Sequence, residues 1–165
     1  MRKIVGFPNP VNEKAARTVA AGVAMLSLTT LVLSFTAGHA WLWLIALIAA
    51  GFLARVFTGP RLSPLGQFAT TIVAPRLGAP KLVPGPPKRF AQAIGATVTI
   101  AGVLLLAAGH PAATQALLGI LIVAACLESI FGFCVGCRIF AGLMRIGLVP
   151  ERICASCADI TLRQA

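Results

Sequence analysis

The chain has 165 residues, of which 58% are hydrophobic and only 11% are charged. A soluble domain usually carries about 25% charged residues, so the composition excludes an ordinary water-soluble protein and indicates a membrane protein. Lysine and arginine number 14 against 4 acidic residues, which gives a net charge of +10. Such a balance often indicates nucleic-acid binding, but no solvated domain exists to present that surface, and we predict no nucleic-acid partner.

The first element, residues 1–17, is a polar lead that we expect to lie at the membrane surface. Four long apolar runs then predict four transmembrane helices, joined in pairs by two very short turns. Each run has close to the roughly 20 residues that a helix needs to cross the hydrocarbon core. The runs cover residues 18–37, 40–57, 90–109 and 113–133. The predicted fold is all-α, a polytopic protein in the lipid bilayer with two helical hairpins.

The longest connection, residues 58–89, contains a predicted amphipathic helix. Ser63-Pro64 is typical of an N-cap followed by proline at the first helical position, and apolar residues then recur at three- and four-residue steps. This helix is too short to span the membrane, so we expect it to lie on the cytoplasmic surface until Ala74-Pro75 ends it. Prolines further along predict a stiff, extended approach to the third span.

The positive charges predict the orientation of the chain. All 14 lysines and arginines fall on the side that holds both termini and the 58–89 loop, whereas the other side has only the turns with His39 and His110. Positively charged loops stay in the cytoplasm. We therefore expect both termini to be cytoplasmic, with residues 1–147 as the transmembrane domain and residues 148–165 as a cytoplasmic tail.

Four of the five cysteines form two C-x-x-C units, Cys134/Cys137 and Cys154/Cys157, with 16 residues between them. This spacing is typical of a metal site, and four converging thiolates would make a structural zinc site that anchors the short tail. The alternative is thiol–disulfide or sulfur-transfer chemistry, in which Cys134 and Cys137 are the working pair. Both interpretations stay open, and we expect the fifth cysteine, Cys126, to be an inert core residue.

The helix that follows the first cysteine pair bears on the reactivity of its thiols. A helix C-terminus beside them would oppose the thiolate, because that end of the helix dipole is negative. The helical pattern continues after Cys137, either as a prolongation of the fourth span or as a second surface helix after a bend at Gly132. Arg138 would favour the thiolate in either case.

Glu128 is the one acidic residue inside a predicted span. Ionisable groups in the membrane are paired or functional by default, so we expect it to pair with Arg55 or with the Lys88-Arg89 edge, or to pass protons to the thiols. Arg55 itself either snorkels to the headgroups or faces a polar cavity. The predicted catalytic residues are Cys134, Cys137 and Glu128. The predicted polar surround is Arg55, Lys88, Arg89 and Arg138.

Several short segments together resemble a known family. They are Val11-Asn12-Glu13, Arg55, Ser63-Pro64-Leu65, Lys88-Arg89-Phe90-Ala91-Gln92, Ile94-Gly95, Leu127-Glu128 and Gly132-Phe133-Cys134-Val135-Gly136-Cys137. From about Pro8 to Gly147 the chain resembles the bacterial family catalogued as domain of unknown function 4395, whose most specific element here is F-C-x-G-C. The resemblance implies an integral protein of the bacterial inner membrane without an established activity. It also implies a thioredoxin-like or rhodanese-like partner.

Three functions stay open at this point. The first is a thiol-redox or sulfur-handling membrane protein that uses Cys134 and Cys137. The second is a non-enzymatic scaffold whose four cysteines bind zinc and present a docking surface to a cytoplasmic partner. The third is a small transporter with Arg55 and Glu128 along its path. Homo-oligomerisation would suit all three, because four helices enclose little volume.

Overall fold

A computed structural model describes residues 7–148, and almost all of this part of the chain is helical. The elements in chain order are β1 (Val11–Asn12), α1 (Glu13–Thr36), the 3₁₀ helix η1 (His39–Trp43), α2 (Leu44–Thr58), α3 (Pro64–Phe68), the π-helical turn η2 (Ala69–Val73), α4 (Ala74–Arg76), β2 (Leu82–Val83), α5 (Gly85–Ala107), α6 (Pro111–Phe131) and α7 (Val135–Arg145). Four helical segments, α1, η1 with α2, α5 and α6, are long and apolar enough to cross a membrane. The chain is therefore an all-α polytopic membrane protein, as its composition predicted.

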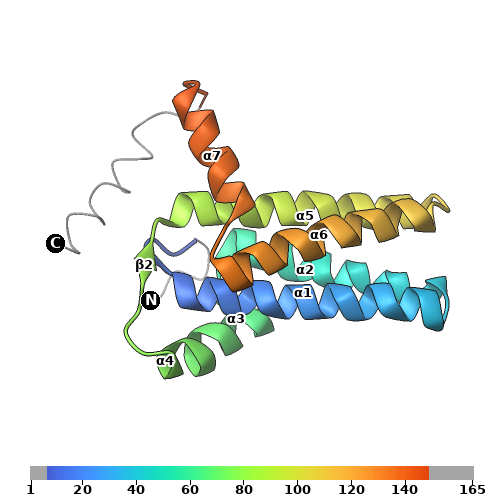
Figure 1. Cartoon of the computed structure of the whole chain (residues 1–165), viewed down its shortest axis with the longest axis horizontal. Helices are drawn as coiled ribbons and strands as arrows, with labels where there is room; N and C mark the ends of the chain where they lie inside the picture. Colours follow the sequence, from blue (N-terminus) through green and yellow to red (C-terminus); the bar gives the residue numbers. More distant parts are fainter. Residues whose placement is uncertain (1–6, 149–165) are drawn as a thin grey trace.

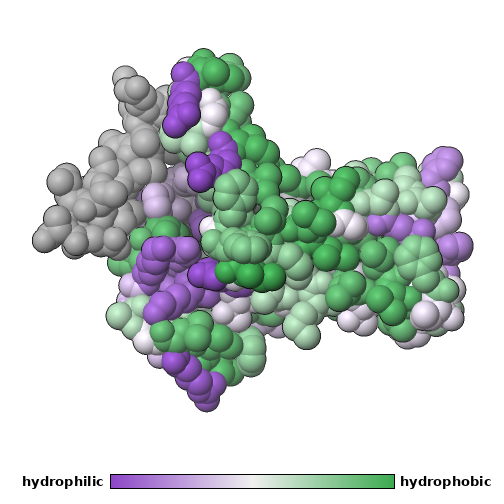
Figure 2. All heavy atoms as spheres, in the orientation of Figure 1, coloured by the Kyte–Doolittle hydropathy of each residue, from purple (hydrophilic) through white to green (hydrophobic). Residues whose placement is uncertain are grey.

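The four long helices lie side by side in an elongated bundle (Figure 1). Within it α1 packs mainly against α6, and α2 packs mainly against α5. The two hairpins therefore interlock, each helix having its main partner in the other hairpin. Figure 2 shows hydrophobic side chains over the length of the bundle, with hydrophilic ones gathered at the end that carries α4 and at the opposite tips. This distribution suits a protein that spans lipid between two polar surfaces.

Small and hydroxylated residues let the helices approach closely. Lipid is as apolar as a leucine side chain, so membrane helices associate through close packing and hydrogen bonds rather than the hydrophobic effect. Thr114 in α6 is fully buried and donates its hydroxyl to the Gly102 carbonyl of α5 at 3.0 Å. Gly95 faces the Phe52 ring so closely that a Cβ there would collide with it. This close contact joins α2 and α5.

The first and third spans, α1 and α5, begin more than one turn before the apolar runs that predict them. Asn12 caps α1 by accepting a hydrogen bond from the Lys14 backbone at 3.0 Å, so the helix starts at Glu13. The start of α5 at Gly85 includes two prolines, which the first turn tolerates because its N–H groups need no partner. Lys88 consequently lies inside a helix rather than in an extended loop.

The prediction that Ala74-Pro75 ends the amphipathic helix is wrong. Ser63 caps α3, as expected, but the helical path continues through η2 and α4 to Arg76. The wider π-turn of η2 precedes the proline, and Pro75 then occupies the first turn of α4, where a missing N–H costs little. The helix stops at Leu77, just before Gly78, whose φ of 83° is left-handed.

The fourth span ends in a bend, and a new helix starts after it. Gly132 closes α6 with a left-handed φ of 67°, a common conformation for glycine after a helix. The chain restarts as α7, which runs across the end of the bundle (Figure 1). Gly136 of α7 lies so close to α5 that an added Cβ would be 2.6 Å from the Ala91 Cα. Of the two open alternatives, the surface helix after a bend is therefore the one adopted.

Candidate functional site

The bend at Gly132 places both thiols of the first cysteine pair at a helix N-terminus. Cys134 is the N-cap of α7, and Cys137 lies one turn further along. The first is buried, the second half-buried, and neither is in a disulfide. A helix N-terminus carries partial positive charge, and thiolates are stabilised in this position. These thiols therefore lie at the helix end that favours a thiolate and not at a C-terminus, which would oppose it.

The two thiols differ in proton affinity because they bond to each other. Hydrogen bonding with Cys137 lowers the pKa of Cys134, although burial and the charge of Glu128 act in the opposite direction. The same hydrogen bond, together with burial, raises the pKa of Cys137. Cys134 is therefore the thiol of the pair that loses its proton more readily.

A buried ion pair lies behind the thiols. Lys88, from the first turn of α5, contacts Glu128 near the end of α6, with 2.6 Å between Nζ and Oε1. Their side chains are only 9% and 14% exposed. The expectation that Glu128 pairs with a basic residue is confirmed, and of the open choices the partner is Lys88 rather than Arg55. The two charges of the pair act on the pKa of both nearby thiols in opposite directions, Lys88 lowering it and Glu128 raising it.

Arg55 is buried inside the bundle and does not snorkel to the surface. Its Nε donates to the Gln92 side-chain oxygen at 2.7 Å, and its Nη1 donates to the Ser63 hydroxyl at 3.1 Å. Its guanidinium also lies 4.6 Å from the centre of the Phe52 ring. The Nη2 atom has no hydrogen-bond partner within residues 7–148. Arg55 thus links α2 to α5 and to Ser63, the N-cap of α3. Of the two interpretations, the structure favours the one in which Arg55 faces the interior of the bundle.

The other two residues of the predicted polar surround, Arg138 and Arg89, lie in different parts of the structure. Arg138, in the first turn of α7, lies 5.2 Å from the centre of the Phe133 ring and borders the thiols. Arg89 donates to the Val56 carbonyl at 3.0 Å, at the end of α2. Lys88 and Arg138 therefore flank the cysteines, Arg55 lies deeper in the bundle, and Arg89 stabilises the neighbouring helix end.

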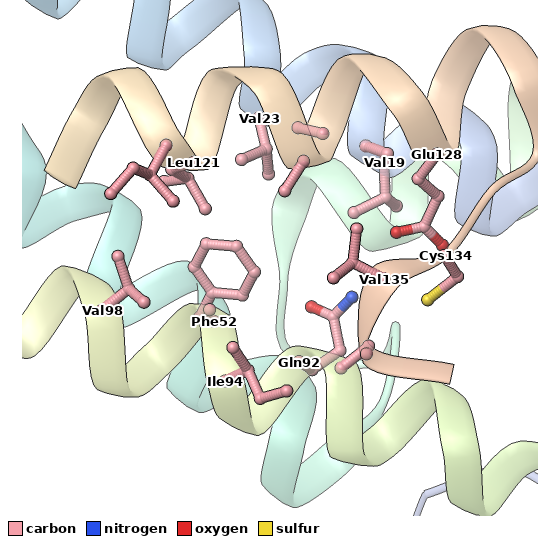
Figure 3. A pocket seen from close by; sticks show the side chains of 17 residues that line it. Val19, Val23, Phe52, Gln92, Ile94, Val98, Leu121, Glu128, Cys134 and Val135 are labelled. Atoms are coloured by element: carbon pink, nitrogen blue, oxygen red, sulfur yellow. The ribbon is translucent and has the colours of Figure 1, made fainter. Parts of the chain in front are cut away.

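Two cavities meet at Cys134. A groove of about 320 Å³ at the end of the bundle is lined by Cys134, Cys137, Lys88 and Arg138. A second cavity of about 170 Å³ lies between the long helices and is walled mainly by apolar side chains, with Cys134 and Glu128 at one end (Figure 3). Within the described part of the chain, Cys134 is the one residue that lines both. It can therefore be reached from the polar end and from the bundle interior.

Two charged residues near the site were missed because the polar lead was read only as a surface segment. Glu13, at the start of α1, lines the groove and forms an ion pair with Lys81 at 2.8 Å. Arg17 donates to the Ser129 and Ile130 carbonyls at 3.0 and 2.6 Å, and so satisfies the C-terminal end of α6 before the bend. Asn12 before an acidic residue is an N-terminal helix signal that could have extended the first helix to include them.

The second cysteine pair, Cys154 and Cys157, lies outside the described residues. Within residues 7–148, no group of three or more histidine, cysteine or acidic side chains is placed to hold a metal ion. The four-cysteine zinc site therefore stays a prediction. Cys126 lies in α6 and packs against the hydrophobic core, in keeping with its predicted role.

Comparison with known proteins places the chain in a family. Searches of curated proteins and of solved structures found no match. The family model described as Domain of unknown function (DUF4395) matches residues 11–145, which include all four spans and the first cysteine pair. The chain therefore belongs to this family, as its F-C-x-G-C element suggested.

Proposed function

We propose that this protein is a membrane thiol-redox protein, with Cys134 as the nucleophile and Cys137 as the resolving thiol. One observation carries the proposal: the two free thiols lie one helical turn apart at the N-terminus of α7. A thiolate held next to a thiol is the reactive arrangement of a C-x-x-C pair.

Thiol–disulfide exchange through this pair takes two steps. The Cys134 thiolate attacks one sulfur of a partner disulfide, forms a mixed disulfide and releases the other partner sulfur as a thiolate. Cys137 then loses its proton and attacks the Cys134 sulfur, which releases the second partner thiol and leaves a Cys134–Cys137 disulfide. Two electrons thus pass to the partner. Glu128, held by Lys88 and lining a cavity with Cys134, is the candidate acceptor for the Cys137 proton.

The groove at the polar end supports a protein partner. Its wall contains both thiols and the cationic Arg138, and it lies where the bundle leaves the lipid. The one-sided distribution of lysine and arginine supports the cytoplasmic face of a bacterial inner membrane. A thioredoxin-like partner would exchange electrons with Cys134. A rhodanese-like partner would instead transfer a sulfane sulfur to the same thiolate, and this sulfur-handling version uses the same nucleophile.

Single cysteine variants test the exchange mechanism. The purified full-length protein is treated with oxidised glutathione, and adducts at each cysteine are mapped by mass spectrometry. Cys137→Ser should accumulate a mixed disulfide at Cys134, because no resolving thiol remains. Cys134→Ser should form far fewer adducts at Cys137, because burial still raises the pKa of that thiol after the contact with Cys134 is lost. Cys126→Ser, a substitution in α6 outside the C-x-x-C pair, serves as the control and should behave as wild type. Equal adduct formation at Cys134 of the Cys137→Ser variant and at Cys137 of the Cys134→Ser variant would refute the proposed roles.

The second candidate is a zinc scaffold that docks a cytoplasmic partner. The observation in its favour is that Cys134 and Cys137 share one groove, while a second C-x-x-C pair follows 16 residues later. Four cysteines could hold zinc with bonds of roughly 2.3 Å. Elemental analysis of the purified protein, beside a free-thiol count, tests it. One zinc per chain, lost when any one of the four cysteines becomes serine, supports the scaffold, and metal-free protein with reactive thiols excludes it.

A further inference from the structure

The apolar cavity inside the bundle has features that the exchange reaction with a soluble partner does not use. Its walls are formed mainly by valine, leucine, isoleucine, alanine and phenylalanine side chains of the long helices. The Cys134 thiol nevertheless lies at its end (Figure 3). A cavity that leads from the membrane interior to a redox-active thiol suggests a second reactant that comes from the lipid.

The size of the cavity suits a single six-membered ring. An apolar cavity of about 150 Å³ in another protein binds benzene, and this one has about 170 Å³. Ile120 contributes to its wall and is 61% exposed on the outer surface of α6. Because α6 is a membrane-spanning helix, that surface faces lipid. A ring can therefore enter from the bilayer while its tail stays among the lipid chains.

One polar group in the wall can recognise a carbonyl oxygen. The Gln92 side-chain oxygen is occupied, because it accepts the hydrogen bond from Arg55 Nε at 2.7 Å. The orientation of the amide is thereby set, and its nitrogen lies on the side of Val135 and Cys134 (Figure 3). An amide nitrogen has only hydrogen atoms to offer, so this wall presents a donor near the thiol in otherwise apolar surroundings.

We propose that this cavity binds the ring of a lipid-soluble quinone, and that the quinone oxidises the Cys134/Cys137 dithiol. The inference rests on the proposed function. The two cysteines lose two electrons and two protons as the sulfur–sulfur bond forms. The two quinone oxygens gain the same two electrons and two protons, which yields a hydroquinone. A thiol partner in the groove then reduces the disulfide again by the reverse of the exchange steps above, so that two electrons pass from a reductant at the polar end through Cys134 to an oxidant in the lipid.

The test uses the reduced full-length protein in detergent and a benzoquinone with four ring substituents, one of them a decyl chain. Full substitution blocks direct addition of thiols to the ring. Differential alkylation read by mass spectrometry reports the Cys134–Cys137 disulfide, and ultraviolet absorbance reports the hydroquinone. Wild type should form one disulfide per hydroquinone, and Cys134→Ser should form neither.

A matched pair of α6 variants tests the cavity. Ala124 lines it, whereas Ala116, two turns earlier in the same helix, is exposed and lies outside its wall. Ala124→Leu should lower the rate of quinone-dependent oxidation about tenfold, because the larger side chain occupies the ring site. Ala116→Leu should leave the rate unchanged. Exchange with oxidised glutathione is measured in parallel and should be equal in both variants, which verifies folding and the thiol site.

The outcomes distinguish a failure of the quinone inference from a failure of the proposed function. If glutathione exchanges with wild type but the quinone does not oxidise it, the quinone inference fails and the proposed function stands. If the quinone oxidises Ala124→Leu as fast as Ala116→Leu, the cavity is not the quinone site and the inference is overturned. If neither reagent reacts with Cys134, both the inference and the proposed function fail.

Discussion

Replacing Gly136 by alanine should displace the thiol site while leaving the bundle in place. Gly136 lies between the two cysteines, where α7 rests on α5. A Cβ built there would be 2.6 Å from both the Cα and the Cβ of Ala91. Backbone atoms of a packed helix cannot yield as the end of a flexible side chain can, so α7 has to move away from α5.

The expected effect on stability follows from the cost of overpacking. An extra methyl group in a packed contact typically costs about 1–3 kcal/mol. Moving α7 also takes Cys134 away from the Lys88–Glu128 pair, whose two charges act on the pKa of the thiol in opposite directions. Gly136→Ala should therefore lower the melting temperature in detergent, and it should change the rate of iodoacetamide alkylation of Cys134 at neutral pH.

Gly142→Ala in the same helix is the matched control. No atom lies within 4 Å of a Cβ built at Gly142, and alanine in a helix is favoured over glycine by about 0.5–1 kcal/mol. This variant should be as stable as wild type or more stable, with unchanged alkylation of Cys134. If both variants behave alike, the close contact between α7 and α5 does not hold the thiol site, and the reasoning is refuted.

Three further predictions follow from the site. Lys88→Met or Glu128→Gln alone should lower the free energy of unfolding by about 3–5 kcal/mol, because each leaves a charge unpaired in a nearly buried place. The double variant Lys88→Met/Glu128→Leu should recover most of this loss. Single variants that are as stable as wild type in detergent melts would contradict the pairing. Cys137→Ala should move the pH midpoint of Cys134 alkylation upward, since the hydrogen bond that lowers the pKa of Cys134 is lost; an unchanged midpoint would mean that Cys137 does not stabilise the thiolate. Reporter fusions within residues 58–89 should give a cytoplasmic signal, as the positive charges there predict, and a signal from the opposite side would invert the topology.

The transmembrane architecture could be predicted from the sequence because hydropathy is a local property. A run of about 20 apolar residues has to form a helix in lipid, where each backbone polar group needs an internal partner. Four such runs therefore predict four spans without knowledge of their packing. Their ends were less predictable, because Asn12 and the prolines after Gly85 extend α1 and α5 beyond the apolar residues.

The candidate thiol residues were also visible in the sequence, since C-x-x-C spacing places two thiols one turn apart. Their chemistry was not, because the same spacing occurs at either end of a helix. The left-handed bend at Gly132 and the close seat of Gly136 on Ala91 turn Cys134 into an N-cap. That choice depends on the packing of α7 against α5, where the contacting residues Gly136 and Ala91 are about 45 residues apart in the chain.

The sequence by itself determined the class, the spans and the family of this protein, because each rests on composition, periodicity or a short motif. Only the tertiary structure decided that Glu128 pairs with Lys88 and that Arg55 turns inward to Gln92. It also decided that Cys134 lies between a polar groove and an apolar cavity. The physical reason is the same in each case. A buried ionic or hydrogen-bonding group is stable only with a partner within about 3 Å, and distant parts of the chain supply that partner.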